Sequence, residues 1–330
     1  MTGGCACRVL ALVILTATPT SAQLNGENVP GDNGVKSGSQ GAPGTYVGVL
    51  YYRYDTDTIR NKDGTRLVFD PTLPARQTMN AALPLFIYVS DFKVLGGNYG
   101  LMAAVPFANA ALEAPAFGFQ RDVSTGPTDL YVVPVQIGWH WQRADVTTAF
   151  GLFAPTGRYT AGAHDNVGKG MWSYELSGGT TVFFDEKKTL SVATSGYWEI
   201  HSKKSGTGDI SAGGVTLTGT KVGQLLTLEG GVGRSFLDGA MSVGLAYYAQ
   251  YKLTDDEFGV PELALLSPVG KHRVWAFGPD VTIPVATKST LFAFVNVRYF
   301  WETGARAKTE GQSLVLTATF PVPSVKIPPK

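Results

Sequence analysis

Hydrophobic and polar residues alternate with a period of two along most of this chain. From Leu291 to Trp301, every second side chain is apolar or aromatic, and the opposite face carries Asn296 and Arg298. No stretch keeps the period of about 3.6 residues that a helix needs, so the pattern predicts strands throughout. The alternation predicts about twelve strands, over roughly 45–54, 78–90, 98–108, 128–141, 146–155, 170–184, 189–201, 221–235, 241–254, 272–284, 291–302 and 312–320.

The connections between these strands alternate between long and short. Long loops on one side and short turns on the other are typical of bacterial outer-membrane barrels, whose short turns face the periplasm. An even number of strands then places both chain ends in the periplasm. The long connections are 55–77, 109–127, 156–169, 202–220 and 255–271, and the short ones are 142–145, 185–188, 236–239 and 286–289.

The sequence therefore predicts an all-β protein, a single transmembrane antiparallel up-and-down β-barrel of about twelve strands. A soluble β-sandwich is the alternative, but its outer faces would be polar, whereas these strands carry Leu, Val and Trp on the face that would point outward. Aromatic residues near strand ends, such as Trp139, Trp141 and Tyr299, suit the girdles that such barrels place at the lipid headgroups.

Four parts follow one another along the chain. Residues 1–22 combine Arg8, a short apolar run and small residues before Gln23, which predicts a signal peptide cleaved after Ala22. Residues 23–44 are rich in Gly and Asn and predict a flexible lead-in. The barrel follows over 45–320, and 321–330 is predicted to be a periplasmic tail. Phe320 ends the last strand in the manner of the signal read by the barrel-assembly machinery, although ten residues follow it.

Composition limits the chemistry that this chain can perform. Charged residues make up 16% and the formal net charge is +1, which argues against nucleic acid as a partner. Both cysteines lie within the predicted signal peptide, so the mature chain folds without disulfides. His140, His164, His201 and His272 have no ligand spacing, and no nucleotide-binding motif is present. We therefore predict no cofactor, no metal and no catalytic residue.

The face opposite the apolar one would line the lumen of the barrel. It mixes carboxylates, cations and aromatic rings, which could bind a small aromatic ligand or could simply pair with one another across a filled interior. The candidate lumen-lining residues are Glu175, Tyr197, Glu199, His201, Glu229, Tyr248, Gln250, Lys252, Phe292, Phe294, Asn296, Arg298 and Glu302.

Several short patterns occur in order between about residues 44 and 320. The patterns are Asp129 with Pro134 and Trp139; Pro155 to Tyr159; Val167 to Trp172; Tyr248 and Gln250 with Thr254 and Asp255; and Arg273 with Gly278 and Pro279. With these patterns, the chain resembles the meta-pathway phenol degradation (MetA-pathway) family of outer-membrane proteins. The resemblance implies an outer-membrane β-barrel associated with uptake of phenol-like or other hydrophobic compounds, and it supplies no catalytic residue. One pattern, Pro155, Thr156, Gly157 and Tyr159, ends a strand and opens a long loop, so these residues are candidates for the outer rim.

The function predicted from these observations is a passive outer-membrane channel for small hydrophobic or aromatic solutes. Its partners would be outer-membrane lipid, those solutes and the barrel-assembly machinery. Two alternatives remain at this point: a barrel that serves as a structural or adhesion scaffold without transport, and an outer-membrane lipid hydrolase whose Ser, His and acid converge from distant strands.

Overall fold

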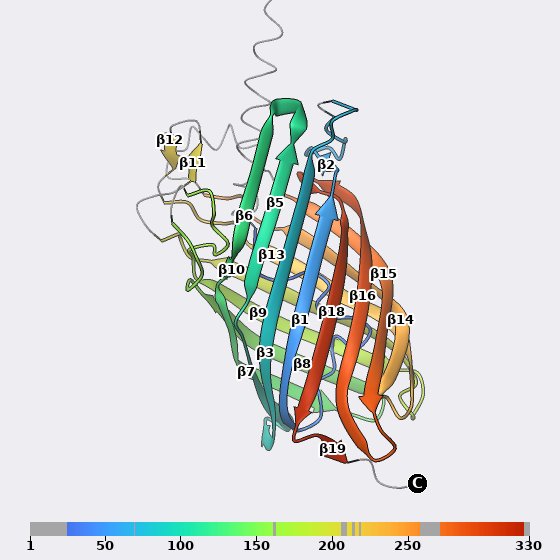
Figure 1. Cartoon of the computed structure of the whole chain (residues 1–330). Coiled ribbons are helices and arrows are strands. Elements are labelled where there is room, and N and C mark those ends of the chain that lie inside the picture. The colour runs from blue at the N-terminus through green and yellow to red at the C-terminus, as the bar shows by residue number, and fades with distance from the viewer. Residues whose placement is uncertain are drawn as a thin grey trace, which may run out of the picture.

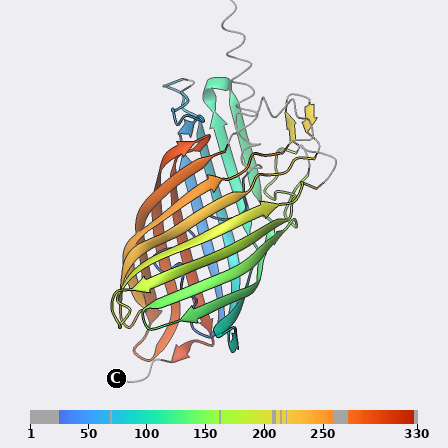
Figure 2. The same ribbon diagram turned by 180° about the vertical axis from the view of Figure 1, so that it is seen from behind.

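The computed structural model describes residues 25–326 except 69, 161–162, 206–209, 213–214, 218 and 258–270. The predicted signal peptide therefore lies outside the described residues. Twelve antiparallel strands close into a barrel when β1 pairs with β3, as predicted (Figures 1 and 2). The order around the wall is β1-β18-β16-β15-β14-β13-β10-β9-β8-β7-β4-β3.

All wall strands but β4, which has 8 residues, are at least 11 residues long, which meets the length of about 9 to 11 residues that a tilted membrane-spanning strand requires. Among the described residues no helix is long and apolar enough to cross a membrane. The wall strands are β1 Gly44–Thr56, β3 Arg76–Val94, β4 Gly97–Ala104, β7 Leu130–His140, β8 Ala144–Ala154, β9 Ser173–Phe183, β10 Leu190–His201, β13 Leu225–Phe236, β14 Met241–Lys252, β15 Arg273–Ala286, β16 Thr290–Arg306 and β18 Gln312–Val322.

Period-two alternation sorts the side chains between the two faces of the wall. Leu176, Val232 and Phe277 are exposed on the outside, whereas their neighbours Glu175 and Gly278 are buried inside. A continuous outer band of apolar side chains is stable only against lipid, since it would be costly in water. The protein is an outer-membrane β-barrel.

Short turns gather at one end of the barrel and long loops at the other (Figure 1). Leu95 and Gly96 join β3 to β4 with φ angles of 52° and 83°, the left-handed conformation that two-residue hairpin turns require. β1 begins and β18 ends at this turn end, where the short strand β19 (Val325–Lys326) pairs with β16. The opposite end is called the loop end below.

The connection predicted over 109–127 is not a loop. It forms a β-hairpin, β5 (Phe107–Ala114) and β6 (Phe119–Pro127), joined by the 3-10 turn η1 (Pro115–Phe117), and β5 pairs with the first half of β3. β3 is long enough to pair with β5 along its first half and with β4 along its second half, so the hairpin continues the wall beyond β4 towards the loop end (Figure 1). The remaining short strands at this end are β2 (Ile59–Arg60), β11 (Ile210–Ala212), β12 (Val215–Leu217) and β17 (Lys308–Thr309).

Candidate functional site: the barrel lumen

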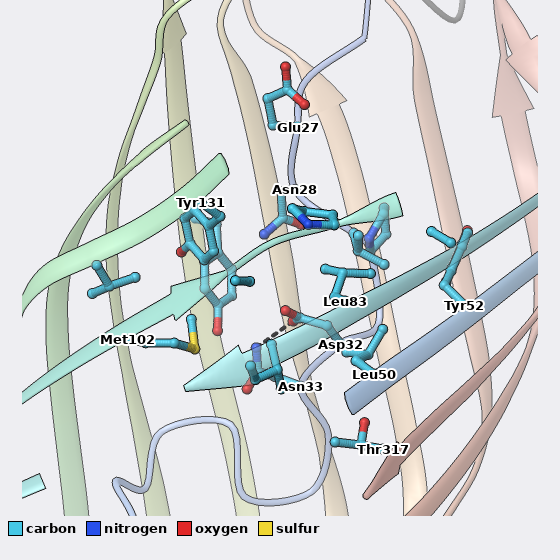
Figure 3. A pocket seen from close by; sticks show the side chains of 18 of the residues that line it. Glu27, Asn28, Asp32, Asn33, Leu50, Tyr52, Leu83, Met102, Tyr131 and Thr317 are labelled. Carbon is cyan, nitrogen blue, oxygen red and sulfur yellow. Dashed lines mark hydrogen bonds between the residues drawn. The ribbon is translucent and has the colours of Figure 1, made fainter. Parts of the chain in front are cut away.

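Residues 25–43 precede β1 and lie inside the barrel; we call them the luminal segment. Gly26 contacts the side chain of Lys169 at the loop end, and Gly44 opens β1 at the turn end. The chain therefore crosses the whole lumen before it enters the wall, and Figure 3 shows the part from Glu27 to Asn33 among the lining side chains. Both chain ends were expected on the periplasmic side, but the described chain begins at the loop end.

Carboxylates of the wall bind the main chain of the luminal segment near the loop end. The N–H of Glu27 donates to Glu199 at 2.6 Å, and the N–H groups of Gly31 and Asn33 donate to the two oxygens of Glu229 at 2.8 and 2.9 Å. Glu199 and Glu229 thus satisfy backbone donors that would otherwise be buried without partners.

The same arrangement continues halfway down the lumen. The N–H of Val35 donates to Asp280 of β15 at 2.9 Å, and Asp280 also accepts from Asn296 at 2.6 Å and pairs with Arg298 at 3.2 Å. The guanidinium of Arg298 donates to the carbonyl of Asp32 at 2.6 Å. Here the inward charges do pair with one another, and the pair also holds the segment.

Polar side chains secure the segment at the turn end. The hydroxyl of Ser39 donates to Asp145 at 2.8 Å, and Asp145 also pairs with Lys188 at 2.6 Å. Gln40 donates to Gln136 at 3.1 Å. Contacts with the wall therefore run from one end of the barrel to the other.

Two glycines of the wall leave room for side chains of the segment. A Cβ at Gly233 would lie 2.8 Å from Cβ of Val35, and one at Gly138 would lie 2.5 Å from the side-chain amide oxygen of Gln40. Val35 is buried against this part of the wall. Any larger side chain at Gly233 would push the segment away.

The start of the luminal segment lies among several charges. Lys169 donates from its ammonium group to the carbonyls of Asn25, at 3.0 Å, and Gly26. Burial raises the pKa of Glu27 to about 8, with Asp129 and Glu199 adding to the shift and Lys169 opposing it. Glu27 is therefore largely protonated near neutral pH.

The luminal segment fills only one side of the barrel. A cavity of about 960 Å³ remains between it and the opposite wall. Apolar side chains dominate that wall, where Leu50, Leu83 and Met102 face the cavity (Figure 3). Tyr131 also lines the cavity and stacks on Phe153, with ring centroids 4.2 Å apart. The luminal segment contributes polar groups on the other side.

This cavity extends along the height of the barrel. Its lining includes Tyr54 and Gln77 near the loop end and Tyr46 and Val89 near the turn end. One side of the lumen is thus closed by hydrogen-bonded chain, and the other side offers a largely apolar passage.

The structure brings all but one of the candidate lumen-lining residues inside the barrel. Glu302 accepts hydrogen bonds from Tyr54 and Tyr248, both at 2.8 Å, and Lys252 pairs with Asp256 at 2.6 Å. Those that line the cavity are Tyr197, Gln250, Phe294, Asn296, Arg298 and Glu302. Those buried against the wall or the luminal segment are Glu175, Glu199, His201, Glu229, Tyr248 and Lys252.

Phe292 does not belong to this group, and its assignment to the lumen is corrected. It is 46% exposed, whereas Leu291 and Phe294 line the cavity. A register shift between Val285 and Ala286 of the partner strand breaks the alternation at this point. A single extra residue reverses which side chains face inward.

The candidate rim residues Pro155, Thr156, Gly157 and Tyr159 lie in the connection after β8, at the loop end. The N–H of Gly157 donates to the buried carboxylate of Asp129 at 2.9 Å. This contact joins two of the patterns that carried the family resemblance.

One serine and one histidine do meet in the lumen. Ser173 Oγ lies 2.9 Å from Nδ1 of His201, and both residues are buried. Among the described residues, the other ring nitrogen of His201 has no hydrogen-bond partner, so none of them supplies the acid that orients the imidazole in a hydrolytic triad. Within the described residues, no group of three or more His, Cys, Asp or Glu is arranged to hold a metal ion.

The family model described as "Putative MetA-pathway of phenol degradation" matches residues 56–318. The chain belongs to this family. The match confirms the resemblance found in the sequence, and it begins within β1, after the luminal segment. A comparison with curated proteins gave no match.

Solved structures share the architecture at low sequence identity. The COG4313 outer membrane channel from Pseudomonas putida F1 is 14% identical, with a TM-score of 0.71, covering 89% of this chain and 99% of the channel. The transport unit of the autotransporter AIDA-I from Escherichia coli is 9% identical, with a TM-score of 0.52, covering 93% and 96%. The beta domain of the Bordetella autotransporter BrkA is 13% identical, with a TM-score of 0.50, covering 85% and 100%. These similarities support the barrel fold.

Sequence reasoning missed the luminal segment and two of its ligands, Asp145 and Asp280. The available signal for the segment was the group of inward carboxylates Glu175, Glu199 and Glu229, which have no basic partners opposite them on the adjacent strands. Such groups need donors from elsewhere, and a Gly- and Asn-rich segment with many free N–H groups can supply them.

Proposed function

We propose that this protein is a passive channel for uptake of small hydrophobic or aromatic compounds, phenol-like ones included. The observation that carries this proposal is the cavity beside the luminal segment, with a largely apolar wall that continues from the loop end to the turn end. The family description adds a link to phenol degradation.

The lining suits transient binding of an aromatic ring. Removing about 100 Å² of apolar surface from water is worth about 2.5 kcal/mol, which favours entry yet permits release. Tyr131, Phe153 and Tyr197 offer rings for stacking. Arg298 and Glu302 provide charges of both signs, so the lining favours neither anions nor cations strongly.

Planar-bilayer conductance of the purified protein tests the proposal. Phenols, aromatic acids and sugars are titrated as blockers, because phenol crosses lipid on its own and obscures simple uptake assays. We expect discrete channels that aromatic compounds block at lower concentration than sugars of similar size. A folded barrel that conducts no ions would contradict the proposal and favour a scaffold. Equal block by sugars and aromatics would contradict the proposed selectivity.

A further inference from the structure

The wall has two breaks at the same height of the barrel, one between β4 and β5 and one between β6 and β7. β4 ends at Ala104 and β5 begins at Phe107, while β6 ends at Pro127 and β7 begins at Leu130. Phe107 is paired with Pro127, so the two breaks lie side by side. Pro106 cannot donate a ladder hydrogen bond, which explains the break between β4 and β5.

Between these breaks and the loop end, the wall has an unpaired strand edge. β6 pairs with β5 on one side, and no described strand pairs with its other side. β8 would be the neighbour, but it ends at Ala154, opposite Leu130 of β7. We call the line between β6 and the end of β8 the seam.

The loop after β8 covers the seam; residues 156–160 and 163–169 are called the cover segment. Arg158 donates from its backbone N–H to the carbonyl of Pro127 at 2.9 Å and from its guanidinium to that of Ser124 at 2.6 Å. From the other side, Arg121 of β6 donates to the carbonyl of His164 at 2.6 Å. Partly exposed arginine contacts thus replace much of the backbone ladder that seals the rest of the wall.

The cavity reaches the inner side of the seam. Its lining includes Pro106 and Thr128 at the strand breaks and Asn166 and Val167 of the cover segment. On the outside, Val105 at the break is 50% exposed. Apolar side chains therefore lie on both sides of the cover, with Val105 outside and Pro106 and Val167 inside, and polar contacts hold the cover in place.

We propose that the seam is a side entrance through which small apolar compounds dissolved in the outer leaflet pass into the cavity. The cover segment closes this entrance and moves aside to open it. This inference rests on the proposed function and gives that function a route of entry. Apolar compounds concentrate in lipid, so an entrance in the wall spares them a return to water. Water-soluble compounds would enter through the ends of the barrel.

The cover segment is also connected to the luminal segment. Asp129 accepts from the N–H groups of Gly157 and Lys169, at 2.9 and 2.7 Å, and so binds both ends of the cover. Lys169 in turn holds the carbonyls of Asn25 and Gly26. Opening the cover at Lys169 would loosen the start of the luminal segment and widen the cavity behind the entrance.

A reversible cross-link tests the proposal. The double variant Ser124→Cys with Arg158→Cys removes the guanidinium contact and lets a short bis-methanethiosulfonate reagent join β6 to the cover. The only native cysteines are Cys5 and Cys7, in the predicted signal peptide. The matched control is Arg143→Cys with Glu186→Cys, a surface pair at the turn end whose charged groups lie 3.5 Å apart.

Two blockers of the bilayer conductance report the route: naphthalene, which is delivered in the lipid, and naphthalenesulfonate, which is added in water. We expect the cross-link to slow the onset of naphthalene block about tenfold, reductant to restore it, and naphthalenesulfonate block to stay unchanged. Unchanged naphthalene block in the linked channel would overturn the side entrance while leaving the proposed function intact. If neither compound blocks the native channel, the proposed function fails and the side entrance fails with it.

Discussion

At the scale of single residues, inward carboxylates decide what occupies the lumen. Glu229 binds the N–H groups of Gly31 and Asn33, and Asp280 binds that of Val35. In most barrels such charges would be wetted or paired across the lumen. Here the carboxylates accept hydrogen bonds from the main chain of the luminal segment. The side chains of Gly31, Asn33 and Val35 therefore matter less for this binding than their backbone N–H groups do.

Replacing Glu229 with Gln should loosen the luminal segment. The amide keeps one acceptor oxygen and places an NH2 group opposite the second N–H, and a buried donor left without its partner costs about 2 kcal/mol. That difference raises the population of a detached segment roughly 30-fold. We expect higher and noisier single-channel conductance, compared with Glu186→Gln, an exposed carboxylate at the turn end. Identical traces for the two variants would show that Glu229 does not hold the segment.

Alkaline pH should also release the segment at the loop end, through Glu27. Its pKa is raised to about 8 in the folded protein, chiefly by burial, from an ordinary value of 4.5. A raised pKa means that the seated state keeps its proton, so this contribution is complete below pH 4.5 and is lost as pH rises through 8. Conductance should therefore increase between about pH 6 and pH 9. Glu27→Gln should remove this pH dependence, and Glu113→Gln on β5 should leave it unchanged.

At the scale of elements, the luminal segment behaves as a thirteenth, unpaired component of the barrel rather than as a linker. It runs opposite to β1 in the lumen and makes its bonds to side chains of β8, β10, β13 and β15 instead of to a strand edge. Side-chain bonds can be exchanged for water without opening the wall. We therefore expect the segment to detach from the wall while the barrel stays folded.

Deleting residues 26–40 tests this separation. The wall retains its twelve strands and their closure, so the variant should still run as a heat-modifiable barrel on gels. We expect its conductance to rise several-fold, since the cross-section now filled by chain becomes water. A variant that folds yet conducts as the native protein does would contradict the view that the segment narrows the channel.

At the scale of the whole molecule, the lumen is divided lengthwise. One half of the wall carries the acidic residues that bind the luminal segment, and the other half carries apolar side chains that face the cavity. This division makes the passage apolar on one side although charges of both signs occur inside.

A charge on the apolar half should weaken passage of aromatic compounds. Leu83→Asp places a carboxylate in the cavity wall, where the lumen can hydrate it and the barrel stays folded. We expect about tenfold weaker block by naphthalene, since a ring would have to lie against a solvated charge. Leu83→Met preserves the apolar surface and serves as the control. Equal block in both variants would place the aromatic path elsewhere in the barrel.

The barrel, its strand number and its location follow from the sequence because the alternation is local: each side chain's face is set by the backbone pleat alone. The inward position of Glu175, Glu199 and Glu229 followed for the same reason, and Phe292 failed where a register shift interrupts the pleat. The hairpin over 107–127 and the seam beside it depend on the unusual length of β3. The path of residues 25–43 has no local signature, because it is determined by carboxylates from strands that become neighbours of the segment only when the barrel closes around it.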